Sequence, residues 1–341
     1  MSGKIRTAGV AGEGRMGTSL FHYIAGFPFE MRWLVSGQAD QEKPGKAWSK
    51  KIARGVSAGI ISRDDAARMD RAVISRDLRI LHDCDLVIEA VTEDKDIKRE
   101  LFTRLDAVVS PDCILATNSS SILPSCLIPS DSRASCMVGL HFFYPVALKD
   151  IVELIIPETV SSEVRESLKV FLKTIDRNYL YQNEKNAFAV NRIFLEFQLE
   201  AWKIAEEGLL SPAAIDTLIR ERFFPLGAFE CFDNVGMDII APSIRNYLEN
   251  DPDKSRFDTL LNRIDELNAA GKLGRKSGEG FFTYSQDSPL PHPSLNDLQP
   301  QAAVAESSLR VALEQATEKF AALSLCSKAE LEEAVGIMAG L

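Results

Sequence analysis

The first half of the chain alternates short apolar runs with longer segments in which apolar residues recur at helical spacing. The apolar runs predict strands at residues 4–11, 31–35, 85–91, 113–117, 137–140 and 151–156. Residues 40–80 are polar and periodic and predict a helical insertion, with a helix start at Ser62. Strands that alternate with helices are typical of a parallel sheet covered by helices on both faces.

Beyond about Glu184 the strand signals vanish and the pattern becomes helical. Phe188 to Glu207 predicts one long amphipathic helix closed by Gly208, and Ser211 followed by Pro212 predicts the start of the next helix. Residues 285–300, rich in Ser, Pro and Asp, predict a linker before a helical tail. The tail faintly repeats the pattern of the long helix, as a truncated second copy of the helical domain would.

A glycine-rich motif, GEGRMG at residues 12–17, follows the first predicted strand and opens a helical segment. In that context the glycines let the backbone approach a pyrophosphate, and the helix start faces it with unpaired N–H groups. The alternative is a tight turn whose glycines serve packing only. The predicted cofactor contacts are Gly12, Gly14, Arg15, Met16 and Gly17.

The fold class predicted from these patterns is α/β. We expect a Rossmann-type NAD(P)-binding domain with a helical insertion at 1–184, and an all-α domain at 185–285. Residues 286–341 would form the linker and helical tail.

One position departs from the dinucleotide-binding fingerprint. About 20 residues beyond the motif the fingerprint has an acid that binds the adenosine ribose. This chain has Ser36 there and no acid before Asp40. A serine can donate to a 2′-phosphate, and the missing carboxylate would have repelled one. NADP use, or relaxed choice between NAD and NADP, is therefore open.

Composition disfavours several classes of function. The 341 residues carry a net charge of −10 and no basic stretch, which argues against nucleic acid as the main partner. No apolar run approaches the ~20 residues of a membrane span, and the N-terminus lacks the apolar core of a signal peptide. The six cysteines show no metal-ligand spacing. We expect reduced thiols, no metal and a cytoplasmic location.

One of the four histidines, His141, lies in an almost wholly apolar run, and the next strand-like run carries one carboxylate, Glu153. A histidine beside a carboxylate in apolar surroundings can be held ready for proton transfer near neutral pH. On these two residues alone, a core histidine satisfied by a nearby acid is an equally good interpretation.

Several motifs, taken together and in order, resemble the L-3-hydroxyacyl-CoA dehydrogenases. Besides the glycine motif they are DLVIEAV at 85–91, LATNSSS at 115–121, GLHFF at 139–143, VNRI at 190–193, FPLGAFE at 224–230 and LGRKSGEGF at 273–281. The resemblance runs from about residue 4 to 285. It implies hydride transfer between NAD(P) and 3-hydroxyacyl-CoA, and a homodimer through the helical domain.

The resemblance also implies roles for single residues in the reaction. His141 would be the general base, and Glu153 would hold its ring and stabilise the cationic form. Ser120 would hydrogen-bond the reacting oxygen, and Asn191 would complete the polar cluster. The alternatives are a helix cap for Ser120 and a local backbone hydrogen bond for Asn191.

Further roles concern the cofactor and the acyl carrier. Glu93 and Lys98 would contact the nicotinamide-side ribose, with a solvated ion pair as the alternative, and Asn118 would also face the cofactor. Weak candidates for contacts to the CoA phosphates lie in the helical insertion: Lys50, Lys51 and Arg54.

Two further departures bear on the substrate. Tyr144 replaces the asparagine that follows His-Phe-Phe in the family, close to the acyl thioester, and Asn186-Ala187 replaces a Pro-Gly pair. The acyl group could therefore be bound to a carrier protein, or the substrate could be a free hydroxy acid of the carnitine or sugar-acid type. A dinucleotide-binding structural protein without turnover is the alternative outside enzymes.

Overall fold

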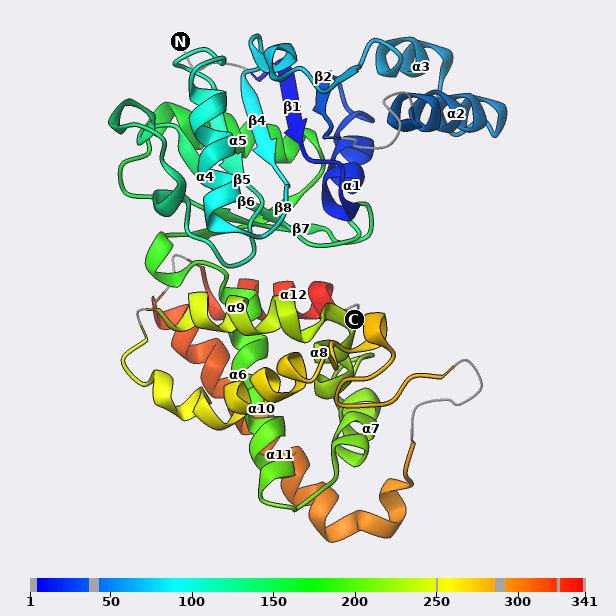
Figure 1. Ribbon diagram of the computed structural model, residues 1–341, viewed down its shortest axis with the longest axis vertical. Coiled ribbons are helices and arrows are strands. Elements are labelled where there is room, and N and C mark those ends of the chain that lie inside the picture. The colour runs from blue at the N-terminus through cyan, green and yellow to red at the C-terminus, as the bar shows by residue number, and fades with distance from the viewer. Residues whose placement is uncertain (1–4, 37–42, 250, 286–291, 324–325, 340–341) are drawn as a thin grey trace. The chain divides into compact units, whose positions relative to one another are not determined.

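The computed structural model describes residues 5–36, 43–249, 251–285, 292–323 and 326–339. It divides into two compact units, Met1–Ala187 and Phe188–Leu341. The first unit combines a sheet with helices, and the second is helical in its described part (Figure 1). The predicted α/β class, with a helical C-terminal part, is confirmed.

The described strands of the first unit form one eight-stranded sheet in the order β3-β2-β1-β4-β5-β6-β7-β8. The strands are β1 Thr7–Ala11, β2 Glu30–Leu34, β3 Val73–Ser75, β4 Leu86–Glu89, β5 Ile114–Thr117, β6 Met137–Phe142, β7 Ile151–Ile155 and β8 Asn178–Gln182. Neighbours from β3 to β6 are parallel, whereas β7 pairs antiparallel with β6, and β8 is parallel to β7. The expected parallel sheet is thus only mostly parallel.

Helices cover both faces of the sheet, which explains why β4 to β7 are buried along their whole length. On one face α1 (Arg15–Ile24) and α5 (Ser162–Thr174) bury Phe21 and Phe171 against the strands. On the other face α4 (Lys95–Asp106) buries Phe102 and Leu105.

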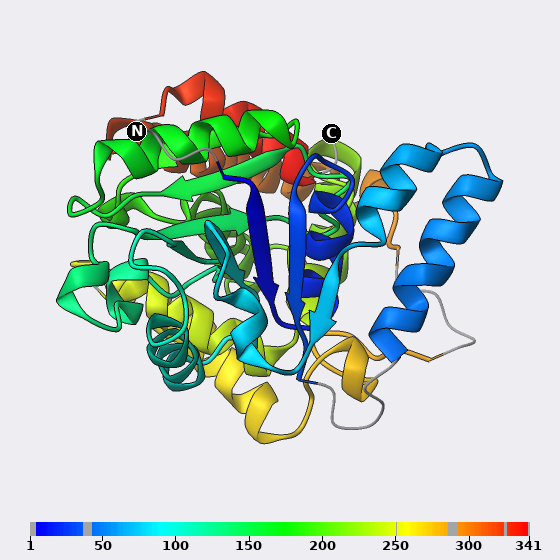
Figure 2. The same ribbon diagram turned by 90° about the horizontal axis from the view of Figure 1, so that it is seen from above.

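The helical insertion between β2 and β4 is confirmed in part. Helices α2 (Lys43–Ser57) and α3 (Arg63–Met69) form a pair beside the sheet (Figures 1 and 2), and the Ser62 side chain caps α3 by accepting from Asp65 N–H. The prediction was wrong at β3, a strand inside the range assigned to helix. Strand β8 was missed as well. Three residues in β3, and the polar sequence NYLYQ in β8, do not produce a recognisable apolar run.

The second unit is built around α6, which contacts α7, α8, α11 and α12. Its helices are α6 Ala189–Glu206, α7 Pro212–Arg222, α8 Ala228–Val235, α9 Met237–Leu248, α10 Asp258–Ala269, α11 Gln299–Leu323 and α12 Lys328–Ala339. Ser211 caps α7 with Pro212 at its first position, as the sequence predicts. In the described parts of the chain, no helix has the length and apolarity that a membrane crossing requires.

The helical tail packs within this unit. Helix α11 buries Leu309 and Phe320, the guanidinium of Arg192 on α6 lies 4.7 Å from the centre of the Phe320 ring, and Lys319 Nζ lies 3.2 Å from Glu196 Oε1. Residues 286–291 of the predicted linker lie outside the described residues. That the tail is a truncated second helical repeat stays a prediction.

Candidate active site

The glycine-rich turn after β1 has two tightly packed glycines and one open one. Gly12 has φ +129°, and a Cβ there would lie 2.4 Å from Ala90 O. A Cβ on Gly17 would lie 2.2 Å from Gly12 O, so both positions need glycine for packing. A Cβ on Gly14 would meet nothing within 4 Å in the described chain, and Gly14 begins α1 without a side-chain cap. The turn therefore leaves an open cradle at a helix N-terminus, where an anion binds well.

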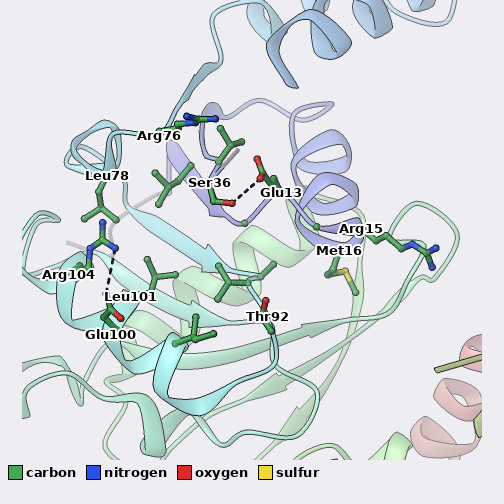
Figure 3. A pocket seen from close by; sticks show the side chains of 17 residues that line it. Glu13, Arg15, Met16, Ser36, Arg76, Leu78, Thr92, Glu100, Leu101 and Arg104 are labelled. Atoms are coloured by element: carbon green, nitrogen blue, oxygen red, sulfur yellow. Dashed lines mark hydrogen bonds and ion pairs between the residues drawn. The ribbon is translucent and has the colours of Figure 1, made fainter. Parts of the chain in front are cut away.

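A cavity of about 560 Å³ opens in front of this turn (Figure 3). It lies where β1, β2 and β4 end, the place where doubly wound sheets bind dinucleotides. Gly12 lines this cavity, and so do four more of the predicted cofactor contacts: Gly14, Arg15, Met16 and Ser36. Leu78, Ile97 and Leu101 add an apolar wall. The residues present therefore fit a dinucleotide; Asp40 lies outside the described residues.

His141 and Glu153 face each other across the antiparallel pair β6–β7. The sheet register places the two residues directly opposite, and His141 Nδ1 lies 2.6 Å from Glu153 Oε2. Both side chains are buried, with His141 5% and Glu153 0% exposed, and the Phe143 ring packs on the imidazole at 4.6 Å between centres. This contact assigns the proton of the neutral ring to Nδ1 and its lone pair to Nε2.

A third buried residue, Gln182, belongs to this pair and was missed from the sequence. It lies on β8, and its Nε2 donates to Glu153 Oε1 over 3.0 Å. One Glu153 oxygen thus contacts the histidine and the other accepts from an amide that cannot ionise. Gln182 could have been found from the sequence only if the polar strand β8 had been recognised.

The predicted ribose contacts Glu93 and Lys98 form a buried charge cluster with Glu89. Lys98 Nζ lies 2.6 Å from Glu89 Oε1 and 3.2 Å from Glu93 Oε2, and the Lys98 side chain is 1% exposed. The alternative of a solvated ion pair is therefore wrong. Glu89 also accepts from Thr117 Oγ1 at 2.7 Å, so the cluster joins β4, β5 and α4.

Glu93 in turn holds the serine loop after β5. Its carboxylate accepts from Ser119 Oγ, from Ser120 N–H at 3.1 Å and from Ser121 Oγ at 3.2 Å. Burial alone would raise the pKa of Glu93, but the Lys98 ammonium and these hydrogen bonds hold it below its usual range. Glu93 is therefore an ionised anchor for the loop at neutral pH.

Within that loop, Ser120 is half-buried while Ser119 and Ser121 are buried. The next helical turn begins after Leu123, so Ser120 does not cap it, and that alternative is wrong. Asn118 Oδ1 accepts from Phe142 N–H over 3.0 Å, which ties the end of β5 to β6 next to His141. In the structure Asn118 thus has a positioning contact; its contact with a cofactor stays a prediction.

Three sets of predicted site residues remain: Asn191, Tyr144 and the cationic residues of the insertion. Asn191 lies on α6 in the second unit, where its Nδ2 donates to Tyr247 Oη over 3.1 Å. Tyr144, at the end of β6, is 53% exposed. The three cationic candidates of the insertion are exposed on α2: Lys50, Lys51 and Arg54.

Two family models match the chain, one in each unit. The family model described as 3-hydroxyacyl-CoA dehydrogenase, NAD binding domain, matches residues 7–185. The model described as 3-hydroxyacyl-CoA dehydrogenase, C-terminal domain, matches residues 188–284.

Individual relatives agree with these matches. A 3-hydroxybutyryl-CoA dehydrogenase of Bradyrhizobium diazoefficiens is 33% identical over 295 residues, 85% of this chain and 99% of that protein. A mitochondrial hydroxyacyl-coenzyme A dehydrogenase of Rattus norvegicus is 35% identical over 206 residues, 60% of this chain and 65% of that protein. The crystal structure of (S)-3-hydroxybutyryl-CoA dehydrogenase from Ralstonia eutropha has a TM-score of 0.74 and 29% identity, and covers 83% of this chain and 100% of that one.

Proposed function

Because the chain belongs to the 3-hydroxyacyl-CoA dehydrogenase family, we propose that it is an NAD-dependent oxidoreductase that interconverts L-3-hydroxyacyl-CoA and 3-oxoacyl-CoA. The observation that carries this proposal is the buried contact of 2.6 Å between His141 and Glu153, in the same unit as the dinucleotide-sized cavity. A base and a cofactor site are the two parts that alcohol oxidation by hydride transfer requires.

His141 is the proposed general base. When bound, the nicotinamide supplies the hydride chemistry. His141 Nε2 takes the hydroxyl proton during oxidation and returns it during reduction, because Nδ1 is committed to Glu153. Glu153 stabilises the imidazolium that forms, and its second oxygen is held by Gln182.

The serine loop is the proposed donor to the reacting oxygen. Ser120 donates to that oxygen, since its two neighbours are buried against Glu93 while its own side chain is half-buried. Asn191 is the remaining member of the polar cluster that the family resemblance implies. Glu93 and Lys98 face the nicotinamide-side ribose, and Lys98 acts mainly by fixing Glu93 and Glu89.

The dinucleotide is held by the glycine-rich turn and the start of α1. Gly14 leaves room for the pyrophosphate, and the uncapped N–H groups of α1 supply donors. NADP is the second candidate cofactor, because Ser36 stands where the fingerprint has an acid. The charges around Ser36 bear on this choice.

The function is tested by following absorbance at 340 nm with NADH and acetoacetyl-CoA. We expect oxidation of NADH with acetoacetyl-CoA and not with free acetoacetate. Turnover of the free acid instead would support the second candidate, a hydroxy-acid dehydrogenase, which Tyr144 in place of the family asparagine favours. NADH binding without turnover of either substrate would support a structural dinucleotide-binding protein.

Gln182 gives a prediction about positioning. Gln182→Leu removes the amide that donates to Glu153 Oε1, and the loss of a buried donor costs ~1–3 kcal/mol. The cost appears as lower stability or as a poorer orientation of His141 and Glu153. We expect kcat to fall about tenfold, the equivalent of ~1.4 kcal/mol, with little change in the KM for NADH. Thermal melting separates a folding defect from this effect, and Tyr179→Phe on the same strand is the control. A lower melting temperature with unchanged kcat would make Gln182 purely structural.

Three further parts of the proposal concern the protein as a whole. A homodimer through the helical domain, contacts from Lys50, Lys51 and Arg54 to a CoA phosphate, and a cytoplasmic location all follow from the family resemblance or from composition. Sedimentation of the full chain would test the first of these.

A further inference from the structure

The corner of the cavity at the end of β2 holds a carboxylate that comes from the turn after β1. Ser36 occupies the position where the dinucleotide fingerprint has an acid. Its Oγ donates to Glu13 Oε1 over 2.9 Å, and both residues line the cavity (Figure 3). Glu13 lies in the glycine-rich turn, between Gly12 and Gly14, and so reaches this corner from the end of β1.

The backbone fixes Glu13 in this place. Strands β1 and β2 are parallel neighbours with Ala11 beside Leu34, and Gly12 N–H donates to Leu34 O over 3.0 Å. Trp33 Nε1 donates to Gly12 O over 2.8 Å, which holds the turn from its other side. The two strand ends are thereby tied together, and the Glu13 carboxylate is presented beside Ser36.

Other charged groups line the same cavity. Arg104 lies 3.9 Å from Glu100, and Arg15 extends away from the Glu13–Ser36 pair in Figure 3. Arg76 also lines the cavity, and its buried Nε has no hydrogen-bond partner in the described part of the chain. A 2′-phosphate bound here would be attracted by Arg76 and repelled by Glu13.

We propose that Glu13, held by Ser36, replaces the missing acid and selects NAD over NADP. This inference rests on the proposed function, since it assigns the cofactor of that same cavity. The Glu13 carboxylate accepts hydrogen bonds from the adenosine ribose hydroxyls, and Ser36 Oγ–H orients the carboxylate. The same charge disfavours a 2′-phosphate, because like charges brought together away from bulk water repel strongly.

The test is direct titration of the full chain with NADH and with NADPH, followed by nucleotide fluorescence. The wild type should bind NADH more tightly. Glu13→Gln keeps the size and removes the charge, so the ratio of NADPH to NADH dissociation constants should fall by about tenfold or more, ~1.4 kcal/mol. Ser36→Ala should shift the ratio in the same direction by less. Glu30→Gln, which removes a carboxylate from the opposite end of β2, is the control and should leave the ratio unchanged.

Two results would overturn the assignment. Tighter binding of NADPH by the wild type would mean that Ser36 and Arg76 recognise a phosphate, and an unchanged ratio in a folded Glu13→Gln variant would remove Glu13 from the choice. Both results come from binding measurements and do not depend on turnover of acetoacetyl-CoA. If acetoacetyl-CoA is not reduced but the ratio shifts as expected, the proposed reaction fails while the role of Glu13 stands.

Discussion

Replacing His141 with glutamine is expected to lower kcat by roughly 10²–10⁴-fold, the range that general acid–base catalysis contributes. Glutamine keeps a polar side chain of similar reach but cannot take up the hydroxyl proton. Because the substitution leaves the glycine-rich turn and the start of α1 unchanged, NADH binding should be unchanged. Steady-state turnover with acetoacetyl-CoA and a fluorescence titration with NADH measure the two quantities separately.

The matched control for this variant is His82→Gln. His82 lies at the end of a short 3₁₀ turn, where its exposed ring contacts Arg79 O at 2.9 Å. We expect this substitution to leave both turnover and binding as in the wild type. Wild-type turnover in a folded His141→Gln variant would reject the histidine as the base.

Replacing Lys98 with methionine is expected to reduce the free energy of unfolding by about 3–5 kcal/mol, the cost of removing one partner from a buried ion pair. Glu89 is fully buried and Lys98 nearly so, and the substitution leaves two carboxylates, Glu89 and Glu93, without their shared cation. The loss arises mainly from the charge left on Glu89, since Glu93 is partly exposed. Urea denaturation followed by circular dichroism measures it.

Two comparison variants make this result specific. Lys95→Met removes a cation from the same helix α4 outside the cluster, and should change stability little. The double variant Glu89→Gln/Lys98→Met removes both charges of the closest pair and should recover part of the loss. A loss in Lys98→Met no larger than the ~0–1 kcal/mol of an exposed ion pair would contradict the account of the cluster.

Much of the fold can be predicted from the sequence because its signals are local. The glycine motif sits between a buried strand and a helix, and the apolar runs from β4 to β7 are continuous because the sheet is covered on both faces. Strands β3 and β8 are missed because β3 is three residues long and β8 has a polar residue at each end, so that neither contains a long apolar run. Both strands lie at the edges of the sheet, where β3 pairs with β2 and β8 pairs with β7.

The candidate site also contains some residues that local sequence patterns reveal and others that they do not. His141 and Glu153 can be singled out as polar residues in apolar runs, but their direct pairing depends on the antiparallel register of β6 and β7. Gln182 and Glu13 cannot be found from local patterns. Each contacts a residue that is distant in the sequence: Gln182 and Glu153 are 29 positions apart, and Glu13 and Ser36 are 23 positions apart. Such contacts appear only when the sheet order is known.

We propose that His141, oriented by Glu153, transfers the proton in oxidation of a 3-hydroxyacyl thioester. The most direct measurement is NADH formation from NAD and L-3-hydroxybutyryl-CoA by the wild type and by His141→Gln, at equal protein concentration and with saturating cofactor. We expect turnover by the wild type and almost none by the variant, with equal affinity of both proteins for NADH. No NADH formation by a wild type that binds the cofactor, or equal rates for the two proteins, would contradict it.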